Sequence, residues 1–112
     1  MIVTPFFLLS DGANRRSDER GYLDILYERD ELVLKRSYSR RSVFRGMHWQ
    51  RPPYAQTKLI RVVAGRILDF VVDPLSEPCR LHHREFTSAD GWIQISANLA
   101  HGFYALEDTE FE

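Results

Sequence analysis

The sequence has little cysteine and no long apolar run, and both absences narrow the range of proteins that it can encode. Cys79 is the single cysteine among 112 residues, so it has no partner for an intrachain disulfide or for a thiolate metal site. No apolar stretch approaches the roughly 20 residues that cross a bilayer. Met1–Pro5 also lacks the basic segment that opens a secretory signal. We therefore expect a cytoplasmic protein without a membrane partner.

A strong excess of charge is absent too. The formal net charge is −1, which gives no general attraction to nucleic acid. With 44% apolar and 28% charged residues, the chain has the composition of one folded domain, and its length predicts a single domain over residues 1–112. Acidic residues gather at 107–112. Basic residues gather between positions 35 and 51, which predicts a local anion site: Lys35, Arg36, Arg40, Arg41, Arg45 and Arg51.

Helical patterning is missing as well, because no segment repeats apolar residues at i, i+3, i+4 and i+7 behind a cap. Short runs rich in Val, Ile, Phe, Tyr and Trp recur instead, which is typical of β-strands joined by turns. Ala64-Gly65 lies between two such runs and predicts a tight hairpin. The pattern predicts an all-β sandwich or barrel with little helix. The expected strands are Ile2–Leu9, Tyr22–Tyr27, Glu31–Ser39, Ser42–Gln50, Gln56–Val63, Arg66–Asp73, Arg80–Thr87, Trp92–Ser96 and His101–Leu106.

Several catalytic and metal-binding motifs are absent. The sequence has no HxH, HExxH or CxxC, and Gln50 stands where an HxH pair would have its second histidine, so we expect no bound metal. The serines lack a G-x-S-x-G setting and no glycine-rich P-loop is present. A serine hydrolase and a P-loop kinase are therefore disfavoured.

The segment Arg45–Gln50 places a cation, an imidazole and an amide on one predicted strand. Because strand side chains alternate, His48 and Gln50 share a face, and Gly46 allows another group to approach that face closely. This arrangement is typical of a pocket wall. The other interpretation is that His48 is an interior histidine packed beside Trp49, which is the commoner role of an isolated histidine.

Lys58 and His101 are further candidates. If Lys58 points inward it must meet an anion or a polarised oxygen, because an unpaired buried ammonium group is costly. If it points outward it is an ordinary solvated lysine, and spacing does not decide between the two. His101 begins the last predicted strand. Of His82 and His83, at most one can face a given pocket, since neighbouring strand residues point in opposite directions.

Five sequence blocks resemble, in their order and spacing, those of the dTDP-4-dehydrorhamnose 3,5-epimerases, and together they cover most of the chain. The blocks are Asp18–Tyr22, Val43–Gln50, Gln56–Leu59, Asp69–Asp73 and Ala100–Phe103. The resemblance implies a cupin-type jelly roll without metal or other cofactor. It also implies a homodimer in which one subunit's N-terminal region completes the neighbour's site.

The same resemblance implies a reaction. These enzymes invert C3 and C5 of dTDP-4-keto-6-deoxyglucose, on the route to dTDP-rhamnose and cell-surface polysaccharide. Protons beside the ketone are acidic because the carbanion delocalises into an enolate, so the reaction needs a base and a stabiliser of the oxyanion. By resemblance, His48 is the base and Lys58 the cation that stabilises the enolate.

The resemblance also implies substrate contacts. Arg45, with Arg20 of the partner subunit, would hold the diphosphate, a task that suits the guanidinium fork. His101 would lie near the sugar, and Gln50 would contact the substrate from the same face as His48. The expected partner is therefore a nucleotide-linked sugar.

Some positions depart from the family. Val33 and Lys35 stand where the family usually carries a glutamine and an asparagine that contact the substrate, and Ser96 and Asn98 replace a proline and a glycine. The family also continues beyond the position of Glu112, where it has its general-acid tyrosine and the aspartate that pairs with the catalytic histidine. A sugar-nucleotide 3,4-ketoisomerase and a non-catalytic nucleotide-sugar-binding module are therefore the alternative functions.

Overall fold

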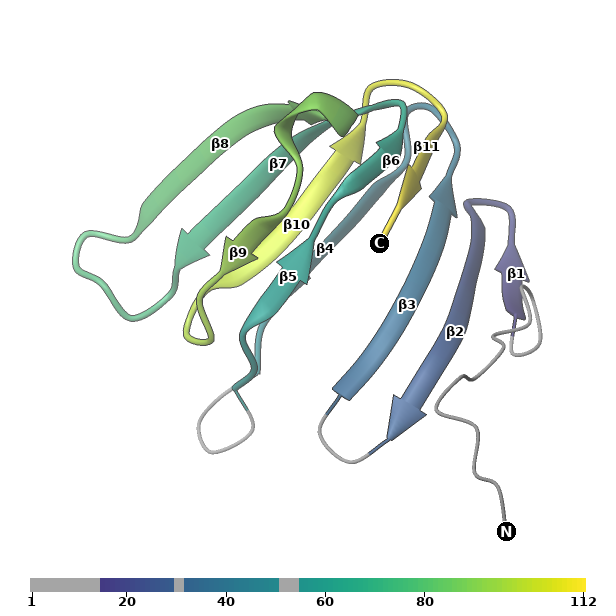
Figure 1. Ribbon diagram of the computed structural model, residues 1–112. Coiled ribbons are helices and arrows are strands. Elements are labelled where there is room, and N and C mark those ends of the chain that lie inside the picture. Colours follow the sequence, from purple (N-terminus) through teal and green to yellow (C-terminus); the bar gives the residue numbers. More distant parts are fainter. Residues whose placement is uncertain (1–14, 30–31, 51–54) are drawn as a thin grey trace, which may run out of the picture.

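The structure is a computed structural model that describes residues 15–29, 32–50 and 55–112. Within these ranges the chain forms eleven β-strands and a single turn of 3₁₀ helix, so the prediction of an all-β fold with little helix is confirmed (Figure 1). The strands are β1 Arg15–Asp18, β2 Gly21–Arg29, β3 Leu32–Ser39, β4 Phe44–His48, β5 Lys58–Ile60, β6 Val62–Ala64, β7 Arg66–Asp73, β8 Arg80–Thr87, β9 Ile93–Ile95, β10 Ala100–Ala105 and β11 Thr109–Phe111.

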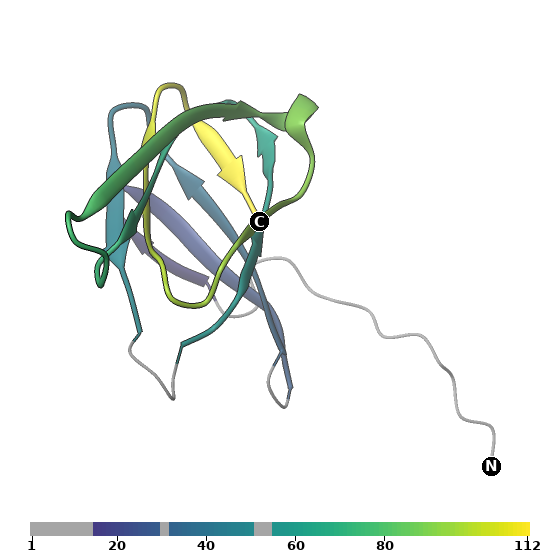
Figure 2. The same ribbon diagram turned by 90° about the vertical axis from the view of Figure 1, so that its left-hand side faces the viewer.

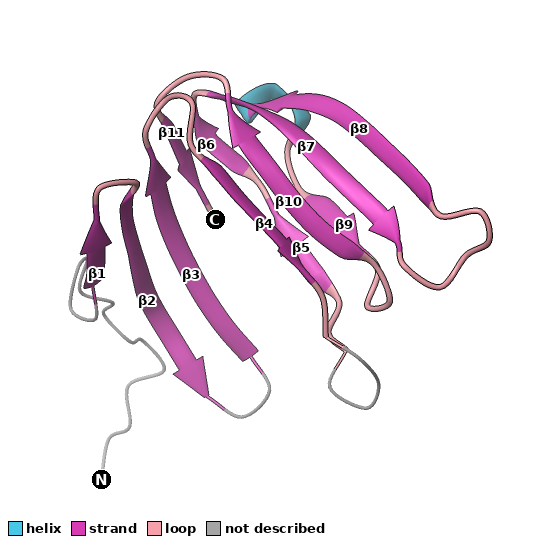
Figure 3. Cartoon of the chain, turned by 180° about the vertical axis from the view of Figure 1, so that it is seen from behind, coloured by secondary structure: helices cyan, strands magenta, loops and turns pink. Residues whose placement is uncertain are grey.

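Two antiparallel sheets enclose a common interior. One sheet has five strands in the order β1-β2-β3-β11-β6, and the other has four in the order β4-β10-β7-β8. β5 and β9 form a short pair of their own, and the strands curve around the interior when the molecule is turned by 90° (Figure 2). Seen from behind, the lower ends of β3, β4 and β5 lie at the same end of the sandwich (Figure 3).

The core joins side chains from both sheets. Val62, Ile67 and Phe103 form a buried cluster, and Phe86 and Phe111 pack against it. The Phe103 and Phe111 rings lie with their centroids 4.8 Å apart, one from each sheet. Apolar area from both sheets is thereby removed from water, which is the main stabilisation available to a sandwich of this kind. The positions of these core residues also show which face of each strand points inward.

The hairpin predicted at Ala64-Gly65 is wrong. β6 pairs with β11, whereas β7 pairs with β10 and β8, so the chain passes from one sheet to the other at this point. Gly65 has φ +92°, and a Cβ here would lie 2.3 Å from the Asp108 carbonyl oxygen. The buried Thr109 side chain also accepts a hydrogen bond from the Arg66 N–H at 3.2 Å. A glycine is needed because the crossing is conformationally demanding and crowded.

Other strand predictions need correction. The predicted strand Gln56–Val63 is divided at Arg61 into β5 and β6, which join different sheets, and β4 ends at His48 instead of Gln50. β1 and β11 were not predicted. The expected strand Ile2–Leu9 lies outside the described residues.

Helix is confined, within the described ranges, to η1 at Ser88–Asp90. Thr87 caps it, since its side chain accepts a hydrogen bond from Ala89 N at 3.3 Å while Asp90 accepts one from Thr87 N at 2.8 Å. No helix of the described residues is therefore long and apolar enough to cross a membrane.

Candidate functional site

His48 and His101 lie directly opposite each other on β4 and β10. The next pair along these strands is Arg45 with Phe103, so three steps on β4 match two on β10 and a β-bulge lies between them. Opposite residues of an antiparallel pair share a face. Arg45 and His48 therefore both lie on the inner face marked by Phe103, although they are three residues apart.

Two glycines make this bulge possible. Gly46 has φ +127°, and a Cβ on it would lie 2.6 Å from Gly102 Cα. A Cβ on Gly102 would lie 2.9 Å from the Arg45 carbonyl oxygen. Sequence analysis predicted a close approach at Gly46 but not the bulge, and so it did not predict that Arg45 and His48 share a face.

Asp69 supports His101 from the neighbouring strand β7. Asp69 Oδ1 and His101 Nε2 are 2.6 Å apart, and the two residues are 3% and 7% exposed. Buried polar groups of this kind are stable when they are hydrogen-bonded to each other. Sequence analysis did not select Asp69. The sequence nevertheless held an indication of its role, because Asp69 is a single carboxylate within the apolar run Ile67–Val72. A carboxylate that is buried in such a run needs a hydrogen-bond partner.

Lys58 points into the sandwich. It is half-buried and shares the alternation of the buried residues Ile60 and Val62 on the same segment. Burial lowers the pKa of Lys58, and the positive charge of Lys35 lowers it further. The structure therefore answers the question of direction that spacing left open: Lys58 faces inward, whereas the side chain of His48, on the inner face of β4, is exposed.

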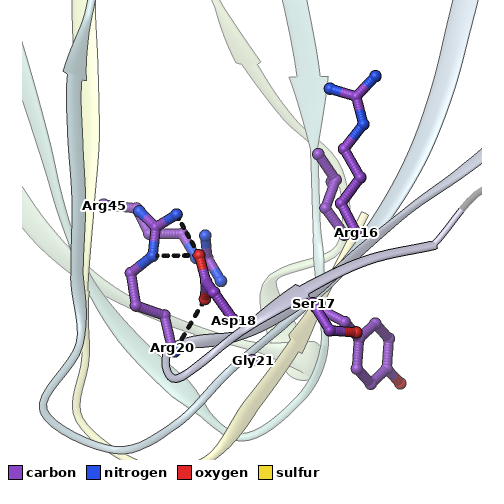
Figure 4. Close-up of a pocket in the computed structure, with 8 residues that line it drawn as sticks. Arg16, Ser17, Asp18, Arg20, Gly21 and Arg45 are labelled. Carbon is purple, nitrogen blue, oxygen red and sulfur yellow. Dashed lines mark hydrogen bonds and ion pairs between the residues drawn. The ribbon is translucent and has the colours of Figure 1, made fainter.

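Arg20 and Arg45 share a pocket of about 260 Å³ between the β1–β2 turn and β4 (Figure 4). Both arginines belong to the same chain here, whereas the resemblance implied Arg20 of the partner subunit. Asp18 lies between the two guanidinium groups. Its Oδ2 accepts hydrogen bonds from Arg20 Nε at 2.9 Å and Nη2 at 2.6 Å, and these bonds lower the pKa of Asp18. The pocket is lined by Arg16, Ser17, Asp18, Arg20, Gly21, Tyr22, Leu23 and Arg45.

Arg45 is held in place from β3. Its Nε donates to Ser39 Oγ at 2.7 Å, and its Nη2 donates to the Tyr38 carbonyl oxygen at 3.3 Å. Burial lowers the pKa of Arg45, the charge of Arg20 lowers it further, and Asp18 opposes both effects. With three arginines against one carboxylate in its lining, this pocket fits an anion.

Gln50 and most of the basic stretch are not brought into this site. Gln50 is exposed beyond the end of β4, so strand alternation does not place it beside His48. Arg36 pairs with Glu112 instead, with Arg36 Nη2 2.9 Å from Glu112 Oε1, and Arg61 Nη2 lies 3.0 Å from Glu112 Oε2. The basic and acidic clusters of the sequence therefore partly neutralise each other, and Arg45 is the member of the basic cluster that the structure places in the anion pocket.

The other two histidines lie on β8. His82 is opposite Val71 and shares the inner face, whereas His83 is opposite Phe70 on the outer face, with ring centroids 6.4 Å apart. In the described part of the chain, no three histidine, cysteine or acidic side chains are grouped as metal ligands. Metal independence stays a prediction.

Fold and site together define a β-sandwich whose interior carries a histidine pair, a lysine and an arginine-lined pocket. The family model of the dTDP-4-dehydrorhamnose 3,5-epimerases matches residues 11–111, and the chain belongs to this family. A dTDP-4-dehydrorhamnose 3,5-epimerase from Streptomyces griseus is 31% identical over 106 residues, which is 82% of this chain and 53% of that protein. The chain spans about half the length of the curated relatives it matches.

Solved structures agree with this assignment. The epimerase from Sulfolobus tokodaii is 27% identical, with a TM-score of 0.62 over 87% of this chain and 70% of its own. The epimerase from Bacillus anthracis, solved with TDP and PPi bound, is 32% identical, with a TM-score of 0.60 over 68% of this chain and 46% of its own. The prediction of a cupin-type jelly roll is thereby confirmed.

Proposed function

We propose that this chain carries the reaction centre of a nucleotide-sugar 3,5-epimerase, which acts on a 4-keto sugar linked to dTDP. The observation that carries the proposal is the β4–β10 register, which puts His48 beside His101 on the inner face of a sandwich into which Lys58 also points. His48 is exposed, so a substrate can reach it, and Lys58 is half-buried on the inward side of its strand. A reachable base and a partly desolvated cation suit proton removal next to a ketone.

The steps follow from these positions. His48 takes the proton from C3 or C5 of the sugar, and the electron pair of that C–H bond moves into the ring to form an enolate. Lys58 stabilises the negative charge on the C4 oxygen, where a preformed cation is most effective because it needs no reorganisation. A proton delivered from solvent to the opposite face of the sugar inverts the carbon and restores the ketone, and His48 releases the abstracted proton to solvent.

The diphosphate is assigned to the pocket of Arg20 and Arg45. Two guanidinium groups can each donate paired N–H bonds to phosphate oxygens. The Bacillus anthracis relative was solved with TDP and PPi bound, which supports a diphosphate as the class of ligand. The Asp18 carboxylate accepts hydrogen bonds from Arg20, so we expect a diphosphate to compete with Asp18 for this guanidinium group.

The function is tested with dTDP-4-keto-6-deoxyglucose in heavy water. We expect deuterium to enter at C3 and C5, because removal and return of each proton exchanges it with solvent, and NMR resolves the two positions. Migration of the carbonyl group would instead indicate a 3,4-ketoisomerase. Binding without any exchange would indicate a non-catalytic module and would contradict the proposal.

A homodimer is part of the proposal. On the outer face of the four-stranded sheet, Phe44 and Leu81 are 46% and 57% exposed, and Phe44 packs against Phe70 with ring centroids 6.0 Å apart. Exposed apolar side chains on one sheet face favour a protein contact. Light scattering at micromolar concentration should give twice the mass of one chain; a monomer alone would refute this part.

A further inference from the structure

Asp18 is the acidic side chain among the described residues that line the arginine pocket, and the proposed function gives it no role except to compete with the diphosphate. Arg16, Arg20 and Arg45 supply the positive charges of this lining, so Asp18 reduces their formal sum from three to two. A negative charge beside a bound anion weakens its binding by direct repulsion. Asp18 therefore opposes the attraction that the three arginines provide.

The turn between β1 and β2 holds the Asp18 carboxylate in place. Its Oδ1 accepts a hydrogen bond from the Arg20 backbone N–H at 2.9 Å, while its Oδ2 accepts the bonds from the Arg20 guanidinium group. Asp18 pairs with Gly21 across the two strands, so the turn is anchored to the sheet on both sides. A diphosphate can displace Oδ2 from the guanidinium group, but the backbone bond to Oδ1 keeps the carboxylate beside the bound phosphates.

Arg45 approaches the same carboxylate from the opposite sheet (Figure 4). Its guanidinium group donates to Ser39 Oγ and to the Tyr38 carbonyl oxygen, so its position is fixed. Burial and the Arg20 charge lower the pKa of Arg45, and the Asp18 charge raises it. Hydrogen bonds from Arg20, and the Arg45 charge to a smaller extent, lower the pKa of Asp18. An anion bound between the two arginines therefore lies close to an ionised carboxylate.

We propose that Asp18 is a specificity residue, which favours a diphosphate with a substituent on its terminal phosphate over free dTDP. The inference rests on the proposed function, in which Arg20 and Arg45 hold the diphosphate. A sugar-linked diphosphate has one ionised oxygen on each phosphate, whereas an unsubstituted terminal phosphate carries about 1.5 to 2 negative charges at neutral pH. Asp18 repels this additional charge. Substrate and product of an epimerase both keep the sugar linkage, so the repulsion disfavours free dTDP without disfavouring either of them.

The test compares dTDP with its β-methyl ester, in which a methyl group blocks the second ionisation of the terminal phosphate, by calorimetry at neutral pH and low salt. We expect the original chain to bind the ester at least as tightly as dTDP. Asp18→Asn keeps a hydrogen-bond acceptor for the turn and removes the charge, so it should strengthen dTDP binding at least about threefold more than ester binding. Glu19→Gln removes the same charge from the same turn, at a residue that does not line the pocket, and should keep the ratio of the two dissociation constants within about 1.5-fold.

The outcomes separate this inference from the proposed function. If Asp18→Asn changes the affinity for both ligands by the same factor, or weakens both, Asp18 acts only on the turn or on Arg20, and the selection is refuted while the nucleotide site stands. A preference of the original chain for dTDP over the ester by about threefold or more would also refute it, and that measurement needs no variant. If the original chain binds neither ligand, the proposed function falls and the selection falls with it.

Discussion

Replacement of His48 by alanine should lower deuterium exchange at C3 and C5 of dTDP-4-keto-6-deoxyglucose by at least about 100-fold. Positioned general bases contribute roughly 10²–10⁴-fold, and His48 lies opposite His101 on the inner face without taking part in the buried hydrogen bond of Asp69 and His101. The rate is followed by NMR in heavy water. Affinity for dTDP should stay within about twofold, since Arg20 and Arg45 lie in a separate pocket that His48 does not line.

The matched control is His83→Ala. It removes an imidazole from the outer face of β8, opposite Phe70, and should leave exchange within about twofold of the original rate. If His48→Ala retained the exchange rate of this control, His48 would not be the base, and His101 would be the next histidine to test.

Replacement of Asp69 by alanine should destabilise the fold by about 3 kcal/mol, because it leaves the buried His101 ring without its hydrogen-bond partner. For a chain of this size that loss lowers the Tm by roughly 10 °C or more. Thermal unfolding followed by circular dichroism measures it. Asp69→Asn should cost less, because an amide oxygen can still accept a hydrogen bond from the imidazole.

Glu85→Ala provides the comparison for Asp69. Glu85 is an exposed carboxylate on β8 whose nearest cation, Arg66, is 3.4 Å away, and removal of such a surface partner should cost less than about 1 kcal/mol. Equal losses for Asp69→Ala and Glu85→Ala would show that the buried pair does not stabilise the fold. A loss of exchange activity in Asp69→Ala beyond its loss of folded protein would indicate that Asp69 also positions His101 toward the sugar.

Strands with apolar alternation could be predicted from the sequence, and strands without it could not. β7 and β8 begin and end at the predicted residues because their turns are marked by proline, glycine and polar residues. β1 has the sequence RRSD and is exposed throughout, so it carries no apolar pattern. Its turn to β2 was nevertheless readable, since Asp18 and Gly21 occupy the positions at which a β-turn favours these two residues.

The site was predictable in its residue types but not in its geometry. Sequence analysis could select His48, Lys58 and His101, because a polar side chain within an apolar strand pattern requires either a hydrogen-bonding partner or a functional role. The shared face of Arg45 and His48 depends on a bulge against a strand more than 50 residues later, and no local pattern reports it. The pairing of Arg36 with Glu112 likewise joins residues 76 positions apart.

The place of β11 between β3 and β6 also constrains how the protein is made. Thr109–Phe111 supply the strand that joins these two parts of the five-stranded sheet, so the sheet has no continuous backbone ladder before those residues leave the ribosome. Until then β3 presents an unpaired edge, which is open to pairing with other chains. Closure of the sandwich therefore has to wait for these residues, and folding must join distant segments, which is intrinsically slow.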